Sequence, residues 1–450
     1  FEDAEVASRE LQLTLTSRNR SGEDCIPMCG VPWHAAEAYI SQLVEKGYKI
    51  AVCDQVEDPR TAKGLVKRAV TRVVTAGTTL EDANLVAKSH NYLGAVFWNE
   101  ERGAGGFAWM DVSTGAWSGL QSSREPELWQ WVFKLAPREL LLAEQAKAPA
   151  HLGLQTGVQV VRVPWQSHFE LKKALTRVLK AQGVVEAGAL GLDKRPELAQ
   201  ACGALVAYLE QTQKQDSGHL APFHPLDMGR FMVLDEITER NLELFRRLDG
   251  RKGVGTLWQV LDQTRTPMGG RLMEERLRYP WRELTPIAET QAVVAHMAEK
   301  PVMREELRRA LDGVHDMERL STRIFLNRCQ PRDLAALRDS LNALPAVKKA
   351  VLCMEDSPEL PSAEEARGDF LPPALFRLIR RWDGMDDLAD LLEKALVDEP
   401  PLQITDGGLF RSGFNAELDE LLELVEHGES RLQALLAAEQ QACGQLKMKI

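Results

Sequence analysis

Two patterns of hydrophobic and polar positions divide the chain near residue 220. Before that point, short runs rich in β-branched residues alternate with helical runs, whereas nearly every later segment has the spacing of an amphipathic helix. Strands that alternate with helices indicate a layered α/β structure with a mixed sheet, and the later half indicates a helical bundle. The pattern therefore predicts a multidomain α+β protein.

Residues 1–80 are expected to form a small mixed domain. The spacing of apolar residues predicts helices over residues 3–15 and 35–46. Concentrated β-branched residues predict strands over residues 50–53 and 70–74.

A meander is the clearest feature of the next segment. Strands are predicted over residues 93–98, 107–112 and 116–120, joined by tight turns. The pattern then predicts helices over residues 125–135, 169–181 and 196–213, and strands over residues 139–143 and 158–163. The polar, turn-rich stretch 213–225 predicts a domain boundary.

Prolines mark the starts of helices in the second half. Pro267 follows Thr266 and is expected to open a helix over residues 268–278. Pro286, Pro301, Pro331 and Pro372 or Pro373 precede helical runs in the same way. A last helix, over residues 415–442, carries a narrow apolar stripe interrupted by Glu429. At ~1.5 Å per residue it would be about 40 Å long, which suits a lever or spacer.

Composition narrows the class of protein. The 450 residues suggest about three domains of roughly 150 residues each. The net charge of −11 means that any nucleic-acid contact needs a local basic patch. No run approaches the ~18 apolar residues of a membrane helix. Seven cysteines without a CxxC pair indicate a reducing cytoplasm. The chain begins with Phe1 and ends in strand-like text, so we expect a piece of a longer chain.

The strongest basic segment lies between Arg60 and Arg72. It contains five bases and no acid, and a second basic loop surrounds Arg18. A charge run is usually a solvated face, yet two basic loops in one small domain also suit phosphate contact. The apolar turn 26–32 follows the loop around Arg18, and is either a core-packing turn or a wedge of the kind that minor-groove binders use.

Catalytic and metal motifs are largely lacking. The chain has no GxxxxGK[ST], HExxH or GxSxG, and the glycines at 103–106 suit a hairpin turn. A zinc site from Cys25, Cys29, His34 and Cys53 is conceivable, but small half-buried cysteines are favoured. Asp111 resembles a metal-binding acid of a ribonuclease-H-like sheet. It also suits a turn in which Asp accepts backbone N–H bonds, which is favoured because no partner carboxylate is identifiable.

Residues 26–35, IPMCGVPWHA, resemble the IPMxGVPxHA segment of the MutS family of bacterial DNA mismatch repair proteins. Further blocks resemble the family in the same order along the chain. They include AVCDQVEDP at 51–59, RVVTAGT at 72–78, TPMG at 266–269, PRDL at 331–334 and GFNAELD at 413–419.

The resemblance implies a domain plan. Residues 1–80 would form a mixed α/β mismatch-recognition domain that lacks its N-terminal part. Residues 85–215 would form a connector, ribonuclease-H-like but not a nuclease. Residues 222–430 would form an all-α core with long lever helices. Residues 431–450 would end the lever and start a DNA-gripping clamp.

The resemblance also implies a function. MutS proteins act as dimers that encircle and kink double-stranded DNA at mispairs and small loops, and use ATP to become a sliding clamp that recruits MutL. The family's Phe-x-Glu motif and Walker motifs are not among these residues, so we expect no catalytic residue, cofactor or metal in this chain, and ATP and Mg²⁺ only in the full-length protein. We expect a cytoplasmic, nucleoid-associated protein without membrane contact.

Five residues carry the expected DNA contacts. Pro27 and Met28 would lie near the minor groove, whereas Arg18, Arg60 and Lys63 would contact phosphates or the rim of the groove. Two alternatives stay open at this point: a helical adaptor that binds only proteins, and a metal-dependent nuclease that acts through Asp111.

Overall fold

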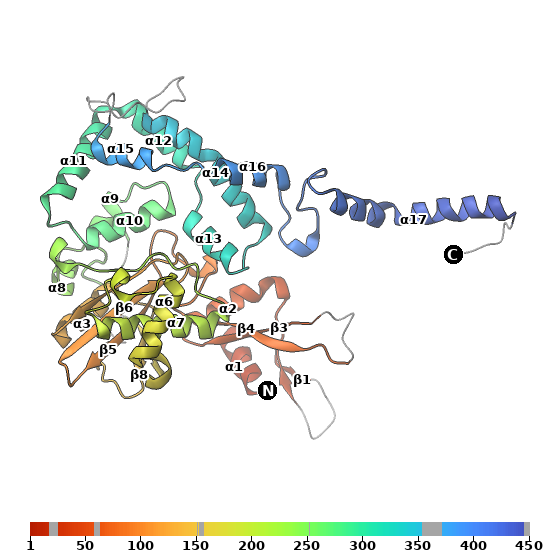
Figure 1. Cartoon of the computed structure of the whole chain (residues 1–450). Helices are drawn as coiled ribbons and strands as arrows, with labels where there is room; N and C mark the ends of the chain where they lie inside the picture. Colours follow the sequence, from red (N-terminus) through yellow and green to blue (C-terminus); the bar gives the residue numbers. More distant parts are fainter. Residues whose placement is uncertain are drawn as a thin grey trace.

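A mixed sheet lies at the centre of the chain, with a small β-containing unit beside it and an arch of helices above it (Figure 1). The computed structural model describes residues 1–17, 26–57, 64–150, 152, 157–251, 253–352 and 371–444. The predicted multidomain α+β class is confirmed, and the change from mixed to helical structure falls at the last strand, β10 (His224–Pro225).

The first unit contains helices α1 (Glu2–Leu11) and α2 (Ala36–Glu45), with the 3₁₀ turn η1 (Trp33–Ala35) between them. Two antiparallel pairs complete it: β1 (Thr16–Ser17) with β2 (Pro27–Met28), and β3 (Ile50–Gln55) with β4 (Arg68–Val74). The helix predicted to reach residue 15 ends early, because Gln12 adopts a left-handed conformation with φ 55°. The Ser8 hydroxyl then donates to the Leu13 carbonyl at 2.6 Å and fixes the turn.

The six-stranded sheet has the order β10-β7-β6-β5-β8-β9. Strands β5, β6 and β7 form the predicted antiparallel meander, while β8 and β9 run parallel to β5. The strands are β5 (Tyr92–Asn99), β6 (Ala104–Asp111), β7 (Trp117–Ser122), β8 (Glu139–Ala143) and β9 (Gln159–Val163). All five predicted strands of this region are confirmed.

Helices cover both faces of the sheet. Successive side chains of a strand point to opposite faces, so Phe107 packs against α3 while Ala108 packs against α7. The covering helices are α3 (Glu125–Leu135), α5 (Trp165–His168), α6 (Leu171–Gln182) and α7 (Pro196–Gln213), with η2 (Asp82–Asn84) and η3 (Ala187–Leu190) as short turns. The central strands are therefore buried on both sides.

Residues 213–225, where we predict a domain boundary, pack against this sheet. Leu220 and Phe223 are buried in the same core cluster as α7, and the Ala221 N–H donates to the Gly115 carbonyl at 2.9 Å. The strand β10 at the end of this stretch adds itself beside β7.

The second half consists of helices, apart from short bridges and turns. They are α8 (Glu236–Asn241), α9 (Leu257–Leu261), α10 (Pro267–Arg278), α11 (Leu284–Glu299), α12 (Pro301–Leu311), α13 (Met317–Phe325), α14 (Pro331–Leu352), α15 (Pro373–Arg380), α16 (Asp386–Ala395) and α17 (Ala416–Cys443), with η4 (Met228–Arg230) and η6 (Ile404–Asp406). Thr266 caps α10 by accepting from the Gly269 N–H at 3.1 Å, as a Thr-Pro start predicts. The prolines at 267, 301, 331 and 373 each open a helix.

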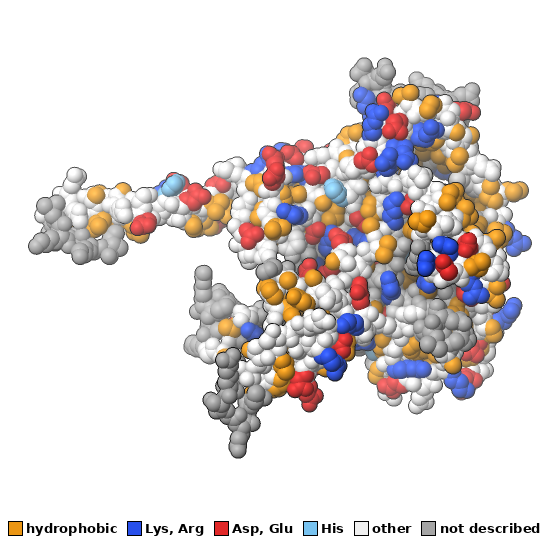
Figure 2. Space-filling view, turned by 180° about the vertical axis from the view of Figure 1, so that it is seen from behind, with side chains coloured by type: hydrophobic (Ala, Val, Ile, Leu, Met, Phe, Trp, Pro, Cys, Tyr) orange, Lys and Arg blue, Asp and Glu red, His pale blue; other side chains and the backbone are white. Residues whose placement is uncertain are grey.

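Helix α17 projects away from the rest of the chain (Figure 1). It has 28 residues, none of them buried, and Asn415 caps its start by accepting from the Leu418 N–H. Apolar side chains lie exposed along it (Figure 2). The predicted long final helix is confirmed. Within the described ranges, no helix combines the length and apolar character needed to cross a membrane.

Helices α6 and α7 meet at Gly203, where a Cβ atom would lie 2.2 Å from the Ala174 Cβ and 2.3 Å from its Cα. We expect Gly203→Ala to push the helices apart and to lower the free energy of unfolding by about 1–3 kcal/mol, the usual cost of overpacking. Chemical denaturation would measure this. The matched control is Gly188→Ala, whose added Cβ meets no atom within 4 Å. Equal stability of the two variants would contradict the close approach.

Candidate nucleic-acid interface

The hairpin of β1 and β2 displays an apolar surface at the tip of the first unit. Met28 is 48% exposed, and the nearby Trp33 is 75% exposed. The Thr16 hydroxyl donates to the Met28 carbonyl at 2.9 Å and Pro27 pairs with Ser17, so the backbone below the exposed side chains is fixed. The sequence left open whether this turn packs into the core or forms an exposed wedge. Because the Met28 side chain is exposed, it does not pack into the core.

Arg18, Arg60 and Lys63 lie outside the described residues. Two bases that we did not single out, Lys67 and Arg68, are exposed at the start of β4. In the part of the chain that the structure describes, neither side chain has an ion-pair partner.

Not every base of this segment is available for phosphate. Arg72 lies 3.6 Å from Glu81, and only about a fifth of its side chain is exposed. Arg72 lies inside the strand predicted over residues 70–74, whereas Lys67 and Arg68 precede that strand. This position in the pattern could have indicated that Arg72 faces the next segment rather than solvent.

The cysteines of the conceivable zinc site are only partly described. Cys29 is half-buried and Cys53 exposed, while Cys25 and the side chain of His34 lie outside what the structure describes. Among the described residues, no three His, Cys, Asp or Glu side chains are grouped as metal ligands would be.

A buried carboxylate, Glu139, attaches this unit to the sheet. The Thr75 hydroxyl donates to its Oε2 at 2.5 Å, and the Tyr208 hydroxyl donates to its Oε1 at 2.6 Å. The Gly77 N–H also donates to Oε2, and Lys49 lies 3.4 Å from Oε1. Thr75, Gly77 and Lys49 belong to the first unit, so one buried charge ties its end to β8 and α7.

A second buried carboxylate, Asp111, lies at the end of β6. Its Oδ1 accepts from the N–H and the hydroxyl of Ser113, at 3.0 and 2.7 Å. Its Oδ2 accepts from the Asn91 N–H at 3.3 Å and lies 2.8 Å from Nδ1 of His90. The turn role expected of Asp111 is confirmed. Four donors occupy a carboxylate that has about four acceptor positions, which leaves no free oxygen for cleavage chemistry.

The environment of Asp111 alters its acidity. Burial would raise the pKa of this carboxyl, but the hydrogen bonds from His90 and Ser113 and the charge of Arg319 together lower it below its ordinary value of 3.8. The buried side chain is therefore ionised.

Arginines of the helical half complete the contact between the sheet domain and the helices around Asp111. We call this contact the polar junction; it consists of Asp111, Ser113, Arg271, Arg319 and Asp316. Arg319 donates to the Ser113 hydroxyl at 3.2 Å and to the backbone carbonyls of residues 86 and 89. Arg271 forms two 2.7 Å bonds with Asp316 and donates to the carbonyl of residue 87. Both arginine side chains are buried, and the Nε of Arg271 has no hydrogen-bond partner in the described part of the chain.

Sequence reasoning missed these arginines. Arg319 follows its partner Ser113 by 206 residues. In the helical pattern, Arg271 and Arg319 occupy polar positions that look solvated. The only local signal was Asp316, which also caps α13 by accepting from the Arg319 N–H at 3.3 Å.

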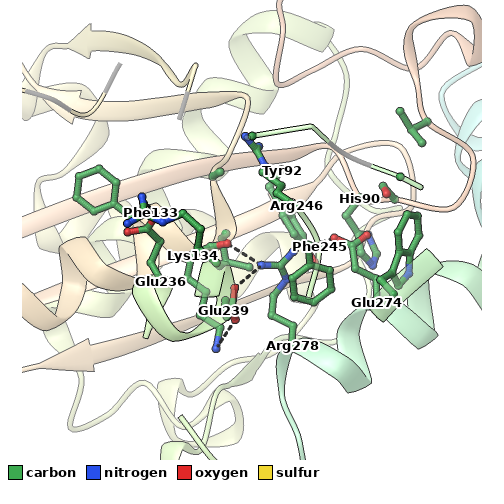
Figure 3. Close-up of a pocket in the computed structure, with 18 of the residues that line it drawn as sticks. His90, Tyr92, Phe133, Lys134, Glu236, Glu239, Phe245, Arg246, Glu274 and Arg278 are labelled. Carbon is green, nitrogen blue, oxygen red and sulfur yellow. Dashed lines mark hydrogen bonds and ion pairs between the residues drawn. The ribbon is translucent and has the colours of Figure 1, made fainter. Parts of the chain in front are cut away.

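A second ionic contact joins the sheet domain to the helices (Figure 3). Lys134 of α3 lies 3.0 Å from Glu239 of α8, and Arg278 of α10 donates to the Lys134 carbonyl at 2.6 Å. Burial lowers the pKa of Lys134, and Glu239 opposes that shift. Arg278 also stacks on the ring of Phe245 at 4.2 Å.

Comparison with known families accounts for most of the chain. The profile of MutS domain I matches residues 1–83, that of MutS domain II matches residues 91–221, and that of MutS domain III matches residues 237–450. The exposed hairpin lies within the first match, and the polar junction joins the second to the third.

Whole-chain relatives agree with these matches. The chain is 60% identical over 452 residues to the DNA mismatch repair protein MutS of Nitratidesulfovibrio vulgaris, and 60% identical over 451 residues to that of Oleidesulfovibrio alaskensis. It is 39% identical over 460 residues to the protein of the same name from Symbiobacterium thermophilum. Each alignment covers 100% of this chain and 50% of the relative, so the chain spans about half the length of the curated relatives that it matches.

Asp111→Asn removes the buried charge of the polar junction. We expect a loss of about 1–3 kcal/mol of stability at neutral pH, because the donors around the carboxylate lose their ionised partner. The folded-state pKa of Asp111 is depressed, so its contribution is complete above pH 3.8 and disappears as the pH falls through the folded-state value.

Denaturation of both proteins between neutral pH and pH 3 tests this. The difference between them should shrink below pH 3.8. Asp193→Asn, at an exposed position, serves as the control and should change stability by no more than about 0.5 kcal/mol. A difference that does not depend on pH would refute the role of the charge.

Proposed function

This chain belongs to the MutS family, and from that membership we propose that it forms the DNA-reading and force-transmitting half of a mismatch repair protein. It would bind double-stranded DNA at mispairs and small loops, and stabilise a kink there. The observation that carries the proposal is the exposed apolar hairpin at Met28, and the same segment, which matches MutS domain I, also exposes the bases Lys67 and Arg68.

The physics of mispairs fits such a surface. A mispair weakens base stacking, so kinking the duplex costs less free energy there than in matched DNA. An apolar side chain that enters the minor groove stabilises the kink, while basic side chains hold the adjacent phosphates. Met28 and Pro27 would supply the wedge, and Arg18, Arg60, Lys63, Lys67 and Arg68 the phosphate contacts.

The domain plan is proposed with the same boundaries as the resemblance implies. Residues 1–80 form the recognition domain, residues 85–215 a ribonuclease-H-like connector, residues 222–430 the core with its levers, and residues 431–450 the approach to the clamp. An antiparallel three-strand meander followed by parallel strands supports the connector assignment. The projecting α17 supports the lever assignment.

The two alternative functions receive no support. A nuclease acting through Asp111 needs free carboxylate oxygens, which are occupied by four donors. An adaptor that binds only proteins leaves the exposed hairpin of the first unit without a role.

The activity of the whole protein rests on the relatives' name and the family. We propose a homodimer that recruits MutL, works in the cytoplasm at the nucleoid, and needs ATP and Mg²⁺. These 450 residues contain no GxxxxGK[ST] loop, and no residue described here is assigned to ATP hydrolysis.

Replacing Arg18, Arg60 and Lys63 together by Ala tests the phosphate contacts. We expect weaker duplex binding and a salt slope that falls by about 2.7, since each lost contact removes about 0.9 from it. Fluorescence anisotropy with a matched and a single-mispair duplex at several salt concentrations measures both. Arg309→Ala, on the exposed face of α12, is the control. Unchanged affinity in the triple variant would favour the adaptor.

Met28→Ala tests the wedge. We expect affinity for the mispaired duplex to fall several-fold more than affinity for matched DNA, because the side chain acts only where the step opens. The control, Met232→Ala, removes a similarly exposed methionine from the second half. Equal losses on both duplexes would place mispair discrimination away from this hairpin.

A further inference from the structure

A cavity of about 680 Å³ lies between the sheet domain and the helical half (Figure 3). One wall comes from the start of β5 and from the end of α3 with the turn that follows it. The other wall comes from α8, residues 245–250 with Gly253, and helices α9 and α10. Its size is that of a small-molecule site, because such pockets measure roughly 300–1,000 Å³ and occur preferentially between domains.

The charges on the wall leave a positive excess. Every acid on the wall pairs with a base of the wall: Glu239 with Lys134 and Arg278, Glu274 with Arg278, Glu236 with Arg240, and Asp249 with Arg247. Arg138 and Arg246 remain. Among the residues that the structure describes, neither guanidinium group has a hydrogen-bond or ion-pair partner. Two free guanidinium groups on one cavity suit an anion with a phosphate group.

The rings on the wall define the remaining chemistry. Tyr92, Phe133, Phe245 and Trp258 line the cavity, so a flat apolar body fits among them. A flat ring linked to a phosphate matches the rings and the free guanidinium groups together. We propose that this cavity binds a nucleotide, either free or at the end of a strand. This site is independent of the DNA surface at Met28.

Isothermal titration of the 450-residue chain with AMP tests the proposal. We expect one molecule bound per chain, with a Kd between about 1 μM and 1 mM. Adenosine and inorganic phosphate should each bind at least tenfold more weakly than AMP, because each supplies only part of the chemistry. No heat with AMP at millimolar concentration would overturn the proposal.

Two variants locate the site. Arg138→Ala with Arg246→Ala should weaken AMP at least tenfold and leave adenosine unchanged. Trp258→Ala, which removes a ring from the wall, should weaken both AMP and adenosine several-fold. The control, Arg309→Ala with Arg381→Ala, removes two exposed arginines of the helical half and should change nothing. AMP binding that survives the arginine double variant would refute the assignment to this cavity.

A 5′-phosphorylated decamer of deoxyadenosine distinguishes the source of the nucleotide. If the arginine double variant weakens AMP and not the decamer, the ligand is a free nucleotide. If it weakens both, the cavity also accepts the end of a strand. Either outcome supports the site. An arginine double variant that binds both AMP and the decamer as tightly as the unaltered chain would contradict it.

Discussion

A charge buried away from water must have partners, and this requirement shapes the molecule at both seams of its sheet. Glu139 and Asp111 are inaccessible to solvent. Glu139 accepts directly from Thr75 and Gly77 of the first unit, whereas Asp111 holds Ser113, which in turn accepts from Arg319 of the helical half. Removing a buried ion from its partners costs several kcal/mol, so neither seam loosens gradually. The neighbouring domains therefore either keep their contacts with these carboxylates or detach from them, because intermediate positions cost free energy.

The two seams lie on the same sheet, which makes that sheet the common support. Glu139 on β8 receives the end of the first unit, and Asp111 on β6 receives the helical half through Ser113 and Arg319. Strands β8 and β6 both neighbour β5. A stiff, doubly covered sheet thus separates a surface suited to DNA from a long helical arm, and a strain on one seam reaches the other through a single strand.

The elements were largely predictable, because the signals that define them are local. Helix α7 runs from Pro196 to Gln213 and strand β8 from Glu139 to Ala143, as their periodicity and flanking prolines indicate. The end of α1 was not predictable, since it depends on the left-handed conformation of Gln12 rather than on the hydrophobic pattern. Met28 was identified through a motif, and its exposure agrees with the role given to it. The polar junction escaped prediction because its partners are distant in sequence: no spacing rule connects Arg319 to Ser113.

The solitary helix α17 also has a mechanical consequence. With no buried residue along 28 positions, it joins the body at its base, next to the Phe410 and Phe414 rings, which stack at 5.8 Å. Its tip stands about 40 Å from that base at ~1.5 Å per residue. A rotation of about 10° at the base therefore displaces the tip by roughly 7 Å, about twice the rise of one base pair of DNA. The arm converts an angular adjustment of a few side chains into a movement on the scale of the nucleic-acid helix.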